Sequence, residues 1–116
     1  METITHHALL YVTTESREEA LAIGRELVEE RVVACANVLD GMTSVYHWKD
    51  TVEQADEAVL LLKTRQELVP RVMDRLQELH SYDCPCILEL PIRSGNPGFL
   101  QWVTDETISP TPPPVA

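Results

Sequence analysis

The chain has 116 residues, of which nine are Lys or Arg and nineteen are Asp or Glu, so its formal net charge is −10. Nucleic acids and anionic membranes are bound through basic side chains, and this balance argues against both as partners. A chain of this length suits one domain that buries about two-thirds of its unfolded surface. We predict a single domain over residues 1–108.

The cysteine count and the lack of long apolar segments predict a cytoplasmic protein. Three cysteines are a poor disulfide framework because their number is odd. No segment approaches the roughly 18 apolar residues of a membrane-spanning helix, and no basic stretch leads into an apolar secretion signal. Cys84 and Cys86 are too close in an extended strand for an easy disulfide, and their side chains point to one face.

The start of the chain predicts a strand followed by a helix. Residues 6–13 contain a short apolar run of strand length. Ser16 and Glu19 have the spacing of a capping box, in which the hydroxyl and the carboxylate each accept a free backbone N–H. The apolar residues that follow recur with helical spacing. We therefore expect a helix over residues 17–30.

Two long strands joined at Lys49 and Asp50 are predicted in the centre of the chain. Residues 32–48 form the first strand, in which Asp40 and Gly41 indicate a bulge because strand character resumes directly after them. Residues 51–64 return beside it and end in an apolar run that is typical of a buried strand.

The alternation of side chains along these two strands predicts which of them share a face. Val45, His47, Gln54 and Asp56 lie on one face. Aromatic residues with convergent polar groups are typical of small-molecule sites, but aromatics are equally typical of subunit contacts. Both interpretations hold if the cleft lies between subunits. The predicted cleft residues are those of the other face together with one later tyrosine: Tyr46, Trp48, Glu53, Glu57, Lys63 and Tyr82.

A second helix follows the hairpin. Thr64 and Glu67 have capping-box spacing, but Pro70 is comfortable only in a first helical turn, so we expect the helix to begin near Gln66. Pro85 prevents the helix from continuing. The predicted buried stripe of this helix is Val69, Val72, Met73, Leu76 and Leu79.

The last part of the chain predicts an edge strand, a short helix and a tail. Pro91 cannot donate to a strand ladder, so the strand over residues 86–92 lies at a sheet edge. A helix over 99–108 follows a turn. Residues 109–116 include four prolines and predict a disordered tail.

The order of elements predicts an α+β fold. A βαββαβ sequence with an extra C-terminal helix is the ferredoxin-like arrangement, an antiparallel sheet with two helices on one face. The other sheet face then lacks a helical cover, and the central hairpin is longer than a small domain needs. Both features indicate self-association.

His80, Cys84 and Cys86 are the candidate metal ligands. Thiolate and imidazole groups suit copper or zinc, and the alternation of a strand places both thiols on one face. The alternative is that these cysteines are buried in the core, as free cysteines commonly are. Cys35 lies in an apolar segment and is expected to be packed rather than catalytic, and the exposed pair His6-His7 is expected to bind only stray metal.

Five sequence blocks identify a family, and they are residues 32–38, 44–48, 53–57, 62–64 and 80–85. In order and spacing these blocks resemble the CutA divalent-cation tolerance proteins, and the resemblance runs from about residue 9 to residue 102. It implies a ferredoxin-like fold and a cytosolic homotrimer in which strands of neighbouring subunits pair edge to edge. It also implies a role in tolerance of copper and other divalent metals, a build similar to nitrogen-regulatory trimers, and no established enzymatic reaction.

The resemblance carries over the family's His-Pro-Tyr-x-x-Pro motif only in part. His80, Tyr82 and Pro85 match it, whereas Ser81 replaces its first Pro. Cys86 stands where a Glu commonly follows the motif, so one cleft carboxylate of the family is absent.

The family's copper ligands carry over less completely. Copper binding in some members uses a Cys on the first strand and a pair of His before the Tyr. Val12 and Leu79 occupy two of these positions, and only His80 matches. We therefore expect copper to bind weakly, and more strongly than zinc because copper leads the affinity order for nitrogen and sulfur ligands.

Together these observations predict a non-enzymatic, cytoplasmic homotrimer that confers divalent-cation tolerance. It requires no cofactor and binds Cu(II) or another divalent metal weakly. One alternative is a signalling or scaffold trimer that binds a small ligand in clefts between subunits. Another is an enzyme that uses the acidic and aromatic cleft residues.

Overall fold

The structure is a computed structural model that describes residues 5–109. The predicted order of strands and helices is confirmed. No helix within the described residues is long and apolar enough to cross a membrane. The elements are β1 (His7–Thr14), α1 (Arg17–Glu29), β2 (Cys35–Trp48), β3 (Thr51–Arg65), a 3-10 turn (Gln66–Leu68), α2 (Val69–Leu79), β4 (Ile87–Pro91) and α3 (Pro97–Glu106).

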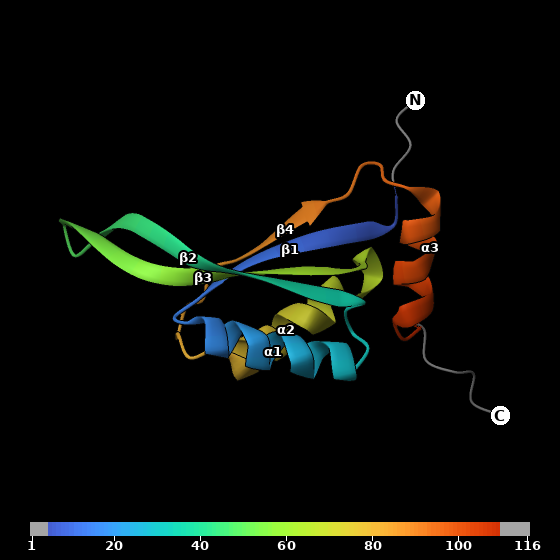
Figure 1. Ribbon diagram of the computed structural model, residues 1–116, viewed down its shortest axis with the longest axis horizontal. Helices are drawn as coiled ribbons and strands as arrows, with labels where there is room; N and C mark the ends of the chain where they lie inside the picture. Colours follow the sequence, from blue (N-terminus) through green and yellow to red (C-terminus); the bar gives the residue numbers. More distant parts are fainter. Residues whose placement is uncertain (1–4, 110–116) are drawn as a thin grey trace.

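The four strands form one antiparallel sheet in the order β2-β3-β1-β4. β1 and β3 lie in the centre, and β2 and β4 are the edges, as Pro91 predicted for β4. Figure 1 shows α1 and α2 together on one face, the β2–β3 hairpin projecting far beyond the other elements, and α3 standing at the opposite end of the sheet. The projecting hairpin gives the molecule its long axis of 54 Å.

The core lies between the sheet and the two helices α1 and α2. The predicted stripe of α2 packs there, with Val69, Val72 and Leu76 buried and Met73 and Leu79 partly buried. Alternate residues of the central strands also point inward, and they are fully buried: Ala8, Leu10, Val12, Ala58, Leu60 and Leu62.

The opposite face of the sheet is largely open, as predicted. α3 covers one end of it, where Lys63 of β3 lies against the Phe99 ring. Leu39, Leu88 and Leu90 remain between 45% and 56% exposed. We call this surface, made of these three leucines with the half-buried Leu9, Tyr11 and Leu61, the open face.

The β2–β3 hairpin has the geometry that its turn residues predict. Lys49 and Asp50 have φ of 49° and 66°, the left-handed pair of a type I′ turn, which matches the twist of the strands. Tyr46 pairs with Glu53, as expected. The register shifts between Leu39 and Met42, around Gly41 with φ of 76°, which confirms the bulge.

The capping box of α1 is half confirmed. The Ser16 hydroxyl accepts the backbone N–H of Glu19 at 3.1 Å. The Glu19 carboxylate does not return to the Ser16 N–H. It accepts the N–H of Glu15 at 3.1 Å and that of Ser81 at 2.9 Å, because the loop after α2 lies beside this end of α1.

The second predicted capping box is wrong. Thr64 is buried in β3, and its hydroxyl donates to the Val32 carbonyl at 2.6 Å instead of capping α2. The chain continues as strand through Arg65 and makes a 3-10 turn at Gln66–Leu68. α2 then follows with Pro70 in its first turn, as expected.

The remaining boundaries differ from the predictions by a few residues. β2 begins at Cys35 instead of residue 32, because the chain bends through the buried residues 32–34. Ala34 already donates its backbone N–H to the Lys63 carbonyl of β3 at 2.8 Å. α3 begins at Pro97, two residues early, because the Asn96 side chain accepts the N–H groups of Gly98 and Phe99. Apart from Ser109, the proline-rich tail lies outside the described residues.

Candidate functional site

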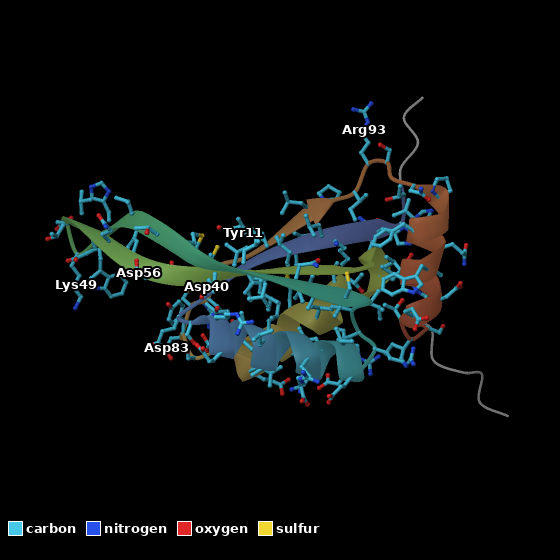
Figure 2. The ribbon with its side chains drawn as sticks, in the orientation of Figure 1. Tyr11, Asp40, Lys49, Asp56, Asp83 and Arg93 are labelled. Atoms are coloured by element: carbon cyan, nitrogen blue, oxygen red, sulfur yellow. The ribbon has the colours of Figure 1, made fainter. Side chains whose placement is uncertain are left out.

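Residues 80–86 connect α2 to β4 and carry most of the residues singled out by the sequence. Figure 2 shows Asp83 of this loop on the helical side of the sheet, towards the end from which the hairpin projects. The loop therefore lies where β1 ends, α1 begins and the hairpin leaves the sheet (Figure 1). We call it the 80–86 loop.

His80 is buried in this loop with both ring nitrogens engaged. It is only 7% exposed, with Nε2 lying 2.7 Å from the Thr13 carbonyl oxygen and Nδ1 lying 3.0 Å from the backbone N of Tyr82. A carbonyl only accepts and a backbone N–H only donates, so Nε2 carries the proton and Nδ1 supplies its lone pair. No lone pair of the imidazole is left for a metal.

Tyr82 and Glu57 are the predicted cleft residues that the structure brings together. The Tyr82 hydroxyl donates to the Glu57 carboxylate at 3.0 Å. Burial, together with this hydrogen bond and the charge of Glu57, raises the pKa of Tyr82 to about 12. The phenol therefore stays protonated at neutral pH and acts as a donor to the carboxylate rather than as a base.

Further hydrogen bonds fix the 80–86 loop. The Glu19 carboxylate accepts the Ser81 N–H, and the Gln77 amide donates to the Asp83 carbonyl at 3.0 Å. Burial alone would raise the pKa of Glu19, but the hydrogen bonds from Ser81 and Glu15 outweigh it and lower the pKa below the ordinary value. The loop is thus tied to both helices and to β1.

The predicted metal ligands do not form a metal centre. Over residues 5–109 the structure contains no group of three or more His, Cys, Asp or Glu side chains that could hold a metal ion. His80 is engaged elsewhere, whereas Cys84 and Cys86 are free and exposed, so the core-packing alternative for these two cysteines is wrong. His7 lies against the Thr104 hydroxyl at 2.8 Å instead of being freely exposed beside His6.

The hairpin carries three predicted cleft residues away from the 80–86 loop. Tyr46 and Trp48 are 43% and 60% exposed, and Glu53 is exposed beside Tyr46. The Lys49 ammonium lies 5.8 Å from the Trp48 ring, a cation–π contact at the hairpin tip. In Figure 2 Lys49 and Asp56 stand on the projecting arm, remote from the centre of the sheet, where Tyr11 lies.

Lys63 occupies a third place, under α3. Its ammonium donates to the Asn37 side-chain oxygen at 2.9 Å and lies 5.5 Å from the Phe99 ring. The Cys35 thiol lies 3.9 Å from the same oxygen of Asn37, and Cys35 is half-buried on the open face rather than packed in the core. Sequence reasoning missed this cluster because the bulge at Gly41 shifts the register, so that Cys35 faces Lys63.

The six cleft residues therefore do not line one cleft of a single chain. Glu57 and Lys63 are six residues apart on β3, which separates their Cα atoms by roughly 20 Å at strand spacing. A surface groove of about 270 Å³ lies between α1 and β2, and none of the six lines it. A site containing all of them would need residues from more than one chain.

Comparison with known proteins agrees with this fold. The family described as "CutA1 divalent ion tolerance protein" matches residues 8–106. The divalent-cation tolerance protein CutA of Thermus thermophilus is 39% identical over 99 residues, which is 85% of this chain and 96% of the relative. A longer mouse relative, protein CutA, is 35% identical, and the match covers 85% of this chain but only 56% of that protein.

The solved structures give the same result. The crystal structure of divalent ion tolerance protein CutA1 from Ehrlichia chaffeensis superposes with a TM-score of 0.85 at 37% identity, and the match covers 94% of this chain and 99% of that one. Names of other relatives place them in the chloroplast or the periplasm, so the family is not confined to one compartment. The chain belongs to the CutA1 divalent ion tolerance family.

Proposed function

We propose that this protein acts in divalent-cation tolerance as a non-enzymatic homotrimer that binds Cu(II) or another divalent metal weakly at its surface. The observation that carries the assembly is the open face with its two unpaired sheet edges. Within residues 5–109, β2 pairs only with β3, and β4 pairs only with β1. Edge strands with exposed apolar side chains aggregate unless something covers them.

A closed ring of copies removes these edges. β2 of one chain and the short β4 of the next are different surfaces, so their contact is heterologous and repeats until the rotation closes. Leu88 and Leu90 would then be covered together with the exposed Leu39. The family resemblance supplies the threefold order of the ring.

The weak metal binding rests on charge and on the residues that remain available. A net charge of −10 attracts cations to the whole surface. His80, the one family copper ligand, is held by Thr13 and Tyr82, so no imidazole of the family site is free. The three free cysteines suit a reducing compartment, which supports the proposed cytoplasmic location.

A thermal-shift screen of metals and metabolites on the purified, metal-stripped protein tests the metal proposal. We expect small, saturable shifts with divalent cations, largest with Cu(II), and no loss of folding in chelator. Turnover of any substrate, or unfolding on metal removal, would contradict the proposal.

A second candidate is a signalling or scaffold trimer that binds a small ligand between subunits. It is favoured by the Glu57–Tyr82 hydrogen bond, which is already formed within one chain. Lys63 of the same chain lies far from this pair, against Asn37, so a lysine in such a ligand site would be the Lys63 of a neighbouring subunit. A metabolite that protects the wild type should then lose its effect in Glu57→Gln, Tyr82→Phe and Lys63→Met. Protection that survives all three changes would remove this candidate.

A further inference from the structure

We propose that Cys84 and Cys86 form a two-coordinate thiolate site for a soft monovalent cation, of which Cu(I) is the biological example. This inference goes beyond the proposed binding of divalent metal, because it names a different oxidation state and a different ligand set. It uses residues of a single chain, so it does not depend on the trimer.

The first argument is access. Both cysteines are free and exposed, and Pro85 between them is only half-buried. A buried thiol cannot exchange protons and ligands with solvent, whereas an exposed one can bind metal as the thiolate. The third cysteine, Cys35, is half-buried on the open face and provides an internal control.

The second argument is separation. Cys84 and Cys86 stand two positions apart, directly before β4, in a segment that bends at Cys84. Cα atoms two positions apart in a chain lie at most roughly 7 Å from one another. A metal between two thiolates needs a sulfur–sulfur distance of about 4.6 Å if each metal–sulfur bond is about 2.3 Å, as it is for zinc. Two cysteine side chains at this spacing can reach one bridging cation.

The third argument is that the segment is held in place before any metal binds. The Thr13 N–H donates to the Cys86 carbonyl at 3.3 Å, and the Gln77 amide donates to the Asp83 carbonyl at 3.0 Å. Pro85 fixes its own φ and restricts Cys84 to extended conformations. The backbone on both sides of the thiols is therefore fixed, and little entropy is lost on binding.

The fourth argument selects the cation. Zinc in proteins takes four ligands, and no third His, Cys, Asp or Glu completes a group around these thiols within residues 5–109. Soft thiolates favour Cu(I), which two sulfurs satisfy in a linear arrangement, and the neighbouring Asp83 offers only hard oxygen. The segment from residue 76 to residue 92 contains three acidic residues and no Lys or Arg, so its charge also attracts a cation.

The test is an anaerobic competition of the reduced full chain with a chromophoric Cu(I) chelator. Wild type and the control Cys35→Ser should each take one Cu(I) per chain with equal affinity. Cys84→Ser and Cys86→Ser should each lower the affinity for Cu(I) at least about 100-fold, because a metal ion held by a single thiolate lacks the chelate effect of two linked ligands. Both changes are at exposed positions, and unchanged circular dichroism will show that the variants fold.

X-ray absorption at the copper edge gives the second measurement, with two sulfur neighbours and no nitrogen expected. Cu(I) binding that is unchanged in the double variant Cys84→Ser/Cys86→Ser, or lost in Cys35→Ser, would overturn the inference. Calorimetry with Cu(II) on the wild type and on this double variant distinguishes the inference from the proposed function. If Cu(II) binds neither protein while Cu(I) binds the wild type, the proposed function fails and the inference stands.

Discussion

His80 shows how a residue that matches a metal motif can serve the fold instead. Its two ring nitrogens join the end of β1, through Thr13, to the start of the 80–86 loop, through Tyr82. The ring also lies 4.8 Å from the Tyr82 ring, between centroids. The imidazole thus positions Tyr82, whose hydroxyl donates to the Glu57 carboxylate.

We expect His80→Ala to destabilise the protein by about 2–4 kcal/mol, because a buried carbonyl and a buried N–H lose their partners and a cavity forms. Denaturant unfolding measures this loss. Cu(II) affinity, measured by calorimetry under conditions where the variant is folded, should stay within about twofold of wild type. Both ring nitrogens are engaged, which argues against the prediction from the sequence that His80 is a metal ligand.

The matched control for this change is His47→Ala, at an exposed position of the hairpin. It should leave the free energy of unfolding nearly unchanged. A clear loss of Cu(II) affinity in His80→Ala but not in His47→Ala would show that His80 is a ligand after all.

Glu19 provides a pH-dependent test of the 80–86 loop. Its pKa is lowered in the folded protein, so its contribution to stability is present above the unfolded pKa of about 4.5 and is lost as pH falls through the folded value. Glu19→Gln should reduce stability by about 1 kcal/mol at pH 7, since the group is partly exposed, and the difference should shrink below pH 4. Urea unfolding at pH 7 and pH 3.5 measures this.

The control for Glu19→Gln is Glu18→Gln, an exposed carboxylate in the same helical turn. A stability difference between Glu19→Gln and wild type that stays constant from pH 7 to pH 3.5 would show that the lost interaction does not involve the charge.

At the scale of elements, the sequence predicted every strand and α-helix from local signals, which were apolar runs for the strands and apolar residues at helical spacing for the helices. The hairpin turn at Lys49-Asp50 and the bulge at Gly41 were predictable because few residues tolerate positive φ. The false cap at Thr64 shows the limit of local spacing. The hydroxyl found a better acceptor at Val32, which is distant in sequence and adjacent only in the fold.

The candidate site was less predictable than the elements because it depends on what the elements bring together. Alternation correctly placed Tyr46 beside Glu53, but strand spacing separates Glu57 from Lys63 by more than one site can span. The engagement of His80 depends on the Thr13 carbonyl, a backbone group that no side-chain motif identifies.

The packing of α1 on the sheet depends on Gly24. A Cβ at this position would lie 2.9 Å from the Ala36 Cβ of β2 and 3.3 Å from a Leu60 methyl. We expect Gly24→Ala to cost about 1–2 kcal/mol by thermal unfolding, because overpacking outweighs the gain of about 1 kcal/mol in helix propensity. Adding Ala36→Gly should restore part of the loss, and a stabilised Gly24→Ala would contradict this close packing.

At the scale of the whole molecule, the exposed aromatics of the hairpin are side chains that the proposed assembly would cover. Trp48 is 60% exposed at the end of β2, on an arm that extends beyond the core. If a neighbouring subunit covers it in the proposed trimer, Trp48→Ala removes a large anchor and costs roughly 2–4 kcal/mol of assembly free energy. Sedimentation of the variant at falling concentration measures this, and an unchanged trimer would show that Trp48 faces solvent.

Unfolding should also be linked to dissociation. Because the proposed contacts between chains stabilise only the assembled state, the melting midpoint should rise with protein concentration. Calorimetric scans over a hundredfold range of concentration measure this, and a constant midpoint would show that each chain folds and unfolds alone.

The mass in solution tests the central claim, that copies of this chain close a ring over the open face. Light scattering at low micromolar concentration and neutral pH measures it without a label or a variant. The account predicts a mass of about three times that of the 13.1 kDa chain. A mass of one chain would contradict it, because β2, β4 and the apolar side chains of the open face would then remain uncovered in solution.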